Sequence, residues 1–408
     1  MTVPSTLSAT APNTETTRLQ VRVYDSLASL ESLRPAWNKL LAEVPAASTF
    51  STWEWLASWW RVFGQGQQLR FLAFIDGREQ FTGMAALALT DQTIFRGCRL
   101  RLLRLMGDGS KDSDNLDVIA RPGFEHAVAG AFLQYLESCR STWDFCALNT
   151  VPSYSPMAQS LLHQLQFRNW THFTSQRAGC LIDLPQDWES YRKQLSYNER
   201  GQLGKFTRRL ERENQVRLYQ ATESDLDSCL QSLFDLHQKR WVSQGEPGSF
   251  SSQARRQFYH DISHAFLERG WLQLWMLELN GLNVAAEYDF RWKDTVYCLQ
   301  GGFDADLAAG HLGYVLRGYV LKQLIETGVA HYDFLAGWQS YKGRWGGRET
   351  SYLNIQFARP RGLGALYLRL KHDSGQAKAW LRGRLPKNVW NVLHNVKAAG
   401  RNRARDKP

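Results

Sequence analysis

The stretch TVYCLQGGFDADLAAGHLGYVLRGYVLKQLIET (Thr295–Thr327) determines the fold that we expect. Its first seven residues alternate like a strand, and the small residues of 304–312 predict a loop. A helix over 312–327 follows, because apolar residues recur there at helical spacing. These residues are Leu312, Val315, Leu316, Tyr319, Val320 and Leu324. They would pack on a sheet, and Gly328 is well placed to end the helix.

The start of this helix is the first candidate binding feature. Gly310 and Gly313 flank it, and the first backbone N–H groups of a helix have no partner within the helix. Together with the positive end of the helix dipole, such groups suit a phosphate or pyrophosphate. An ordinary β-to-α turn has the same sequence pattern, so this loop alone leaves both interpretations open.

Length and charge limit the possible classes of protein. At 408 residues the chain is long for one core and suits two domains, and its 43% hydrophobic content is that of a globular protein. The net charge of +10 comes from 361–408, where twelve lysines and arginines stand against two aspartates. A basic tail indicates a local partner surface or a solvated end. The body is near neutral, so we do not expect nucleic acid as a partner.

Cysteine usage and hydropathy bear on the compartment. The six cysteines are dispersed without a CxxC pair, which argues against a disulfide framework or zinc site and favours reduced thiols. No run reaches the roughly 18 apolar residues of a membrane-spanning helix. The first 17 residues also have no apolar signal-peptide core. We expect a cytoplasmic protein.

We expect four segments along the chain. A disordered leader covers 1–18, because its Thr, Ser, Ala and Pro residues show no periodicity. Two mixed α/β modules follow, one over 19–180 and one over 181–360. A basic amphipathic tail covers 361–408.

Periodicity predicts the elements of both modules. In the first module we expect strands over 19–25, 69–77, 81–91, 99–106 and 145–149, and helices over 30–41, 53–63, 125–138 and 157–165. In the second we expect one or two helices over 192–213, helices over 226–241 and 253–269, strands over 272–279, 284–292 and 295–301, the helix already described, and strands over 331–337 and 351–359. The short connections NGLN and WKD predict antiparallel hairpins. The fold class is therefore α/β (α+β) with a mixed sheet.

Two patterns are similar to metal sites but lack essential ligands. The loop GDGSKDSDNLD (107–117) has four aspartates, but Leu116 takes a ligand position of the EF-hand spacing and no glutamate closes the loop. His260 and His264 are spaced like a zinc pair, but Asp261 replaces the catalytic glutamate of HExxH and no third ligand is suggested. We expect no metal.

The polar segment over 192–213 has a basic side. Its members are Arg200, Lys205, Arg208, Arg209 and Arg212. The glutamates between them favour a solvated helix face. A clamp for anionic groups of a cofactor or substrate is the alternative.

A family resemblance rests on five motifs of the second module, which are LxLxGxxVAAEYxF, YxxxxGFD, GHLGYVL, DFLAG and YKxRW. With the order of elements, they resemble the GNAT acyl-CoA N-acyltransferase fold and, more specifically, the CelD/BcsL-type acetyltransferase family linked to cellulose and exopolysaccharide synthesis. The resemblance is strongest over 195–357, and the first module looks like a degenerate first copy of the same domain. The helix-entry loop departs from the usual GNAT pattern at Leu307 and Leu312. The resemblance implies tandem GNAT-like domains and transfer of an acyl group from acetyl-CoA, or another acyl-CoA, to an amine or hydroxyl.

Within this resemblance, Glu287 is the candidate general base. It lies in a strand that would face the cleft. A carboxylate among Ala285, Ala286, Tyr288 and Phe290 would take up a proton more readily than one in water. A surface position on the strand is the alternative.

The resemblance also implies roles around the last motifs. Tyr341 stands where GNAT enzymes often place the general acid that protonates the leaving thiol, and Asp333, the third catalytic candidate, would orient Tyr341 or Lys342. The predicted cofactor-binding residues are Gly302, Phe303, Gly310, His311, Leu312, Gly313, Lys342 and Arg344. Of these, Lys342 and Arg344 would meet phosphates or an acidic substrate.

Two other functional classes remain open. One is an aminoacyl-tRNA-dependent transferase of the FemABX type, to which a tandem fold and the basic helix would also be suited. The other is a non-catalytic assembly subunit with a decayed fold. The tail, with Trp380 and Trp390 among basic residues, could place the protein peripherally on an anionic inner membrane. Packing of the tail on the domain is the alternative.

Overall fold

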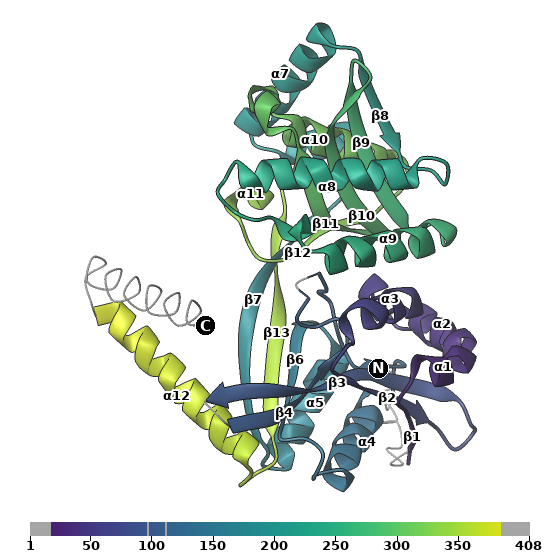
Figure 1. The fold of residues 1–408 in the computed structure, drawn as a ribbon, viewed down its shortest axis with the longest axis vertical. Coiled ribbons are helices and arrows are strands. Elements are labelled where there is room, and N and C mark those ends of the chain that lie inside the picture. The colour runs from purple at the N-terminus through teal and green to yellow at the C-terminus, as the bar shows by residue number, and fades with distance from the viewer. Residues whose placement is uncertain (1–17, 96–97, 111, 385–408) are drawn as a thin grey trace, which may run out of the picture.

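A computed structural model describes residues 18–95, 98–110 and 112–384. It shows two lobes joined by long strands (Figure 1). Strands of both lobes form one continuous mixed sheet, with the order β1-β2-β3-β4-β6-β13-β7-β12-β11-β10-β9-β8 and with β5 paired to β3. The mixed α/β fold class is therefore confirmed.

The first lobe follows the expected order of elements. Its strands are β1 (Gln20–Tyr24), β2 (Gln68–Ile75), β3 (Phe81–Phe95), β4 (Cys98–Leu105), β5 (Ile119–Ala120) and β6 (Phe145–Pro152). Its helices are α1 (Leu27–Leu30), α2 (Arg34–Glu43), α3 (Trp53–Phe63), α4 (Glu125–Ser138) and α5 (Pro156–Phe167). Short β5 was not expected, because two residues are too few for a periodic pattern.

The second lobe contains the stretch Thr295–Thr327. Its helices are α6 (Trp188–Gln194), α7 (Tyr197–Glu213), α8 (Leu226–Val242), α9 (Gln253–Glu268), α10 (Leu312–Glu326) and α11 (Ser340–Gly343). Its strands are β8 (Val216–Gln220), β9 (Leu272–Leu279), β10 (Leu282–Trp292), β11 (Thr295–Phe303) and β12 (His331–Ala336). The stripe of α10 is buried as expected except for half-buried Tyr319, and Gly328 follows the helix with φ +72°.

The lobes share two long strands, β7 (Thr171–Asp183) and β13 (Arg348–Ala358). Strand β13 pairs with β6 of the first lobe, β7 pairs with β12 of the second, and the two strands pair with each other along their length. Each lobe's sheet therefore continues into a strand from the other half of the chain. In Figure 1 both strands run between the lobes, so the lobes cannot separate without breaking the sheet. The expected module boundary at 180/181 lies within β7.

One pair of parallel strands creates the space for a site. Strands β11 and β12 pair only from Thr295 to Tyr297 against His331 to Asp333. The register of β12 against β7 shifts after Asp333, and that of β10 against β11 shifts after Tyr288. Such bulges bend strands and interrupt pairing. Beyond the last pair, β11 and β12 part.

Helices cover both faces of the second lobe's sheet. Residues of α6, α7 and α10 form one buried cluster with the sheet, and residues of α8 and α9 belong to another that continues into α3 of the first lobe. Ion pairs also cross between the lobes. Glu54 pairs with Arg269 at 2.8 Å, and Asp112 pairs with Arg255 at 2.8 Å.

The tail begins as helix α12 (Leu363–Arg384). Ala365 and Leu368 pack on the first lobe's sheet, whereas Leu363, Leu366 and Leu370 are exposed. A Cβ atom on Gly364 would lie 1.9 Å from the carbonyl oxygen of Asp144, so only glycine allows this close packing. Residues 385–408, and the expected leader apart from Arg18, lie outside the described residues.

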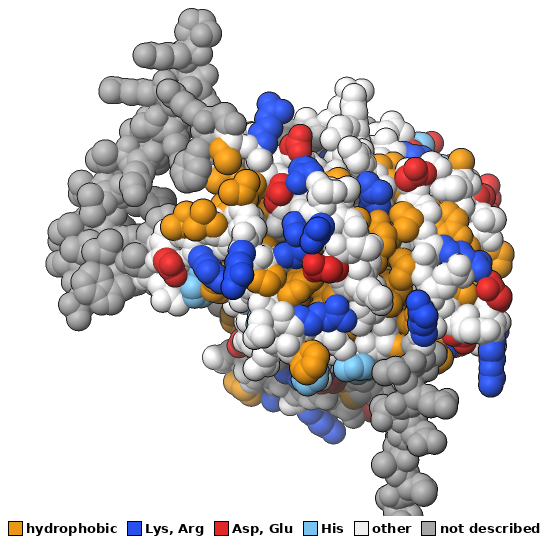
Figure 2. All heavy atoms as spheres, turned by 90° about the horizontal axis from the view of Figure 1, so that it is seen from below, with side chains coloured by type: hydrophobic (Ala, Val, Ile, Leu, Met, Phe, Trp, Pro, Cys, Tyr) orange, Lys and Arg blue, Asp and Glu red, His pale blue; other side chains and the backbone are white. Residues whose placement is uncertain are grey.

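Among the residues that the structure describes, no helix is long and apolar enough to cross a membrane. On the face shown in Figure 2, basic and acidic side chains are interspersed. The described residues on that face therefore form no continuous basic surface.

Candidate active site

The parting of β11 and β12 opens into a cavity of about 530 Å³. Residues of α8, β10, β11, α10 and the α11 region line it. Every predicted site residue except Gly310 and Asp333 is among them. The start of α10 is therefore not plugged, and one cavity joins it to Glu287 and Tyr341.

The start of α10 is shaped by close packing. His311 has φ 52°, and its ring stacks on Phe206 of α7 at 3.8 Å between ring centroids. A Cβ atom on Gly313 would lie 3.2 Å from the ring of Phe303. Residues His311 to Tyr314 line the cavity, and the dipole of the helix favours an anion at this wall.

Strand β11 approaches α8 closely at Gly302. A Cβ atom there would lie 2.4 Å from the backbone nitrogen of His237, so a larger residue would force the helix away. The ring of His237 also lines the cavity, and burial lowers the pKa of His237 to about 4. The imidazole is therefore neutral at neutral pH.

Glu287 lies in a charged network rather than an apolar one. Its Oε2 atom accepts hydrogen bonds from Nε of Arg317 at 3.1 Å and from Nη2 at 2.8 Å, and its Oε1 atom accepts from Tyr332 at 2.5 Å. Glu287 is 2% exposed. The network orients the carboxylate through charge-assisted hydrogen bonds.

The apolar environment expected for Glu287 is wrong, because successive side chains of a strand point to opposite faces. Tyr288 points toward α9, where its hydroxyl is 2.6 Å from that of Ser263, whereas Glu287 points toward α10. Sequence reasoning also missed Arg317. The available signal was an arginine between Leu316 and Val320 on the apolar side of the central helix.

Tyr341 lines the cavity from the start of α11 and is 40% exposed. Burial raises the pKa of Tyr341 above its usual value, so the phenol keeps its proton at neutral pH. A protonated phenol at the cavity wall can donate a proton to a leaving group.

The two basic residues after Tyr341 differ in position. Lys342 is buried, and its Nζ atom donates to the carbonyl oxygens of Phe334 at 2.9 Å and Gly337 at 2.7 Å. It therefore ties the end of β12 to α11. Arg344 is largely exposed at the cavity rim, 3.8 Å from Glu199, and remains available to an anion.

Asp333 supports the backbone rather than the neighbours that the sequence indicated. Its Oδ1 atom accepts from the N–H of Leu335 at 2.7 Å, and its Oδ2 atom accepts from Tyr352 at 3.4 Å. Leu335 has φ 63°, in the left-handed region that a leucine rarely adopts. Asp333 does not line the cavity; it stabilises the bulge that lets β12 part from β11.

A pH-dependent stability follows from Asp333. Burial raises the pKa of Asp333 to about 6, whereas an aspartate of the unfolded chain titrates near about 3.9. The stabilisation from the protonated form is therefore complete below about pH 4 and is lost as the pH rises through about 6. Between about pH 4.5 and 7, we expect wild-type protein to lose about 2 kcal/mol more unfolding free energy than Asp333→Asn. Urea unfolding at both pH values checks this, and parallel changes would contradict it.

Arg240 is a second cavity residue that sequence reasoning missed. It projects from α8, with its guanidinium 5.1 Å from the ring centroid of Phe303 and 3.4 Å from the carbonyl oxygen of Gly301. Together with Arg344 it gives the wall near the α10 start a positive charge. The signal in the sequence was weak, because an arginine near the end of a helix is usually a solvated residue.

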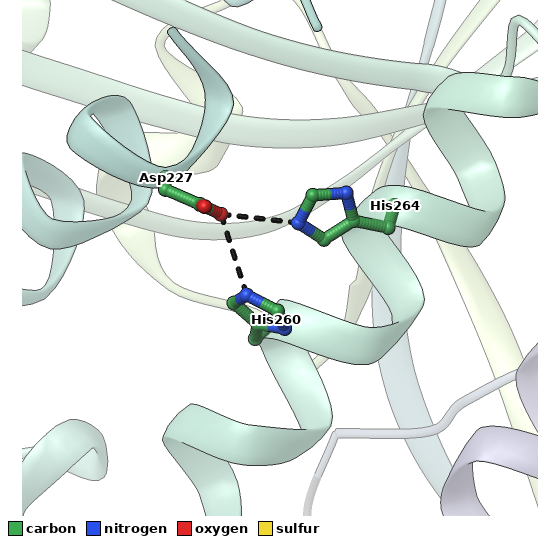
Figure 3. A group of neighbouring side chains, drawn as sticks. All are labelled: Asp227, His260 and His264. Atoms are coloured by element: carbon green, nitrogen blue, oxygen red, sulfur yellow. Dashed lines mark hydrogen bonds and ion pairs between the residues drawn. The ribbon is translucent and has the colours of Figure 1, made fainter.

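The histidine pair of α9 lies outside this cavity. Figure 3 shows both rings turned toward Asp227 of α8, whose Oδ1 atom is 3.3 Å from Nε2 of His260 and 3.0 Å from Nε2 of His264. The sequence suggested no third group beside this pair, because the carboxylate of Asp227 comes from another helix. All three side chains are exposed.

The aspartates of the acidic loop serve separate contacts rather than converging on one point. Asp108 accepts from Asn149 at 2.9 Å, Asp112 pairs with Arg255, Asp114 accepts from the N–H of Ala336 at 3.1 Å, and Asp117 accepts from Ser155. Two of these contacts reach the second lobe. The loop therefore helps to dock the lobes together.

Comparisons with known proteins agree with this architecture. Residues 198–343 match the family model described as an acetyltransferase (GNAT) domain, whereas none of the curated proteins compared with this chain matches it. The crystal structure of FemX is similar, with a TM-score of 0.59 and 10% identity over 86% of this chain and 99% of that one.

Two further solved structures are similar. A conserved protein of unknown function from Bacteroides thetaiotaomicron has a TM-score of 0.52 at 12% identity, with 83% of this chain and 100% of that one covered. L-PGS from Bacillus licheniformis has a TM-score of 0.50 at 11% identity, with 84% and 96% covered. At such identities the likeness shows the fold alone. The fold expected from the sequence, a tandem GNAT-like pair of domains, is confirmed.

Proposed function

We propose that this chain, whose second lobe contains a GNAT-type acetyltransferase domain, transfers an acyl group from acyl-CoA, in the first instance acetyl-CoA, to an amine or hydroxyl. One observation carries the proposal. A single cavity brings the start of α10 together with an oriented carboxylate, Glu287, and a protonated phenol, Tyr341. An anion-binding helix start beside acid and base groups is what thioester aminolysis requires.

The steps follow from the chemistry of the thioester. The diphosphate of CoA would lie against the turn from His311 to Gly313, with Arg344 at the rim. The acceptor nitrogen or oxygen attacks the carbonyl carbon while Glu287 accepts its proton, and the C–S bond breaks. Tyr341 then donates a proton to the thiolate. N–H groups near Gly302 and Phe303 would polarise the carbonyl.

Binding of acetyl-CoA provides the first test. We expect Arg344→Ala to weaken acetyl-CoA binding roughly tenfold, because it removes a charge-assisted contact to a phosphate. Isothermal titration calorimetry measures the affinity. The matched control is Arg217→Ala, an exposed arginine of β8 that pairs with Glu278 and does not line the cavity. If neither acetyl-CoA nor longer acyl-CoAs bind to wild-type protein, the proposal is wrong.

A second candidate is an aminoacyl-tRNA-dependent transferase. It is favoured by the exposed basic residues of α7, including Lys205 and Arg208, which lie on the helix that stacks Phe206 against His311. A tRNA shift assay at about 50 and 200 mM salt tests it, because phosphate contacts weaken steeply with salt. Binding of tRNA that competes with acetyl-CoA would favour this candidate over the first.

The pathway is a further part of the proposal. The CelD/BcsL-type motifs favour an acceptor from cellulose or exopolysaccharide synthesis in the cytoplasm. The exposed leucines of α12 and its basic residues favour peripheral contact with the inner membrane. A non-catalytic assembly role is the remaining alternative, and wild-type protein that binds acetyl-CoA without turning it over with any acceptor would support that role.

A further inference from the structure

A second cavity, of about 550 Å³, lies between the lobes. The acidic loop and β6 of the first lobe supply Asp108, Asp114, Asn149 and Thr150. The shared strands supply Arg177 and Asn354, and β12 supplies residues from Phe334 to Ala336. Its wall is mostly polar and comes from both halves of the chain.

The two cavities share part of a wall. Cys298, Leu299, Phe334 and Lys342 line both of them. Three of these residues belong to β11 and β12, just beyond the last paired position at Tyr297 and Asp333. The gap between the two strands therefore lies between the cavities. This gap is the place where a molecule in the second cavity would approach the acyl end of a thioester held in the first.

The second cavity contains carboxylates with spare hydrogen-bonding capacity. Asp114 uses Oδ2 to accept from Ala336, and among the described residues its Oδ1 atom makes no hydrogen bond. Asp108 likewise uses Oδ2, for the side chain of Asn149. Burial raises the pKa of both aspartates, and the charges of Arg177 and Lys342 oppose that shift at Asp114. A cationic group beside these carboxylates would stabilise their ionised forms.

Neutral hydrogen-bonding groups surround the carboxylates. Asn354 accepts from the N–H of Thr150 at 3.0 Å and holds that residue at φ 55°, where a β-branched side chain is strained. Amide and hydroxyl side chains next to carboxylates match a ligand that carries hydroxyl groups and a protonated amine.

We propose that the second cavity binds the acceptor and that this acceptor is a small, hydroxyl-rich molecule with a primary amine, of the chemistry of an amino sugar. Asp114 holds the amine at the gap between β11 and β12. This inference rests on the proposed acyl transfer and adds the class of acceptor and the side from which it enters.

These groups account for every proton and bond that changes in the transfer. The ammonium gives one proton to the Asp114 carboxylate, and the free amine forms a C–N bond with the thioester carbonyl carbon. The C–S bond breaks, Glu287 accepts the second nitrogen proton, and Tyr341 supplies a proton to the sulfur. The products are an amide and free CoA thiol. Asp114 returns its proton to water, and the proton held by Glu287 restores that of Tyr341 through solvent.

The experiment compares Asp114→Asn with a control variant, Asp261→Asn. Asp261 lies on α9, accepts a hydrogen bond from Gln257 and lines neither cavity. Thiol release from acetyl-CoA is measured with glucosamine, with glucose and with putrescine. We expect turnover with glucosamine and none with glucose. The KM for glucosamine should rise at least tenfold in Asp114→Asn and stay unchanged in Asp261→Asn, because a charged contact to the amine is lost. The Kd for acetyl-CoA should be the same in both.

Glucosamine binding to CoA-free protein, measured by saturation-transfer NMR, separates the two proposals. One outcome is that acetyl-CoA fails to bind, whereas glucosamine binds to wild-type protein and not to Asp114→Asn. The donor proposal is then wrong, and the polar cavity is still a binding site. If acetyl-CoA binds while glucosamine does not, or while Asp114→Asn keeps the wild-type KM, the acceptor inference is overturned. Faster turnover with putrescine than with glucosamine would overturn the hydroxyl-rich part of the inference.

Discussion

Replacing Arg317 by methionine is expected to lower the free energy of unfolding by about 3–5 kcal/mol, because it leaves the charge of Glu287 buried without a cationic partner. Both side chains of this pair are almost completely enclosed, with exposed fractions of 14% for Arg317 and 3% for Glu287. The guanidinium donates two hydrogen bonds to one carboxylate oxygen. Denaturant unfolding followed by tryptophan fluorescence measures the loss.

A double variant distinguishes charge burial from lost packing. Arg317→Met with Glu287→Leu removes both charges and should recover most of the stability, since a buried ion pair and an apolar pair of similar volume are often close in stability. The double variant should have no transferase activity, because it lacks the Glu287 carboxylate that is the proposed general base. If the double variant is as unstable as Arg317→Met, the loss comes from packing rather than from the unpaired carboxylate.

The second large effect is expected for Tyr341→Phe. If Tyr341 protonates the leaving thiolate, its loss should lower kcat about 100-fold or more. The Kd for acyl-CoA should change little, because the phenol is placed at the reacting sulfur rather than at the diphosphate. The rate at which the CoA thiol is released gives kcat, and isothermal titration calorimetry gives the Kd.

Tyr197→Phe is the matched control, since that tyrosine is 83% exposed at the start of α7 and does not line the cavity. Wild-type kcat in Tyr341→Phe would reject the assignment of the general acid. An unchanged kcat together with weaker acyl-CoA binding would instead place Tyr341 in cofactor binding.

Local patterns predicted much of the second lobe. The helix expected over 312–327 is α10, and the strands expected over 272–279, 284–292 and 295–301 are β9, β10 and β11 with small shifts at their ends. Elements of this kind depend on the spacing of apolar residues and on turn residues within a short window. Strands β7 and β8 were missed, because their polar and apolar residues alternate only in part and their stability comes from their partners.

The candidate site was predictable as a list of residues but not as a set of interactions. Glu287 and Tyr341 do line one cavity. However, the partner of Glu287 comes from α10, Lys342 spends two hydrogen bonds on backbone carbonyls, and Asp114 of the first lobe reaches β12 of the second. None of these contacts follows from neighbours in the sequence.

By itself, the sequence determined most of the strands and helices, the helix start at a glycine-bearing loop, and the general chemistry of the side chains around it, because each of these depends on residues within about one or two helical turns of each other. Only the tertiary structure decided that β7 and β13 are shared between the lobes and that two cavities meet at the gap between β11 and β12. The physical reason is distance along the chain. Gly179 pairs with Thr350, and Asp114 binds Ala336, so these contacts form only when the whole sheet is assembled.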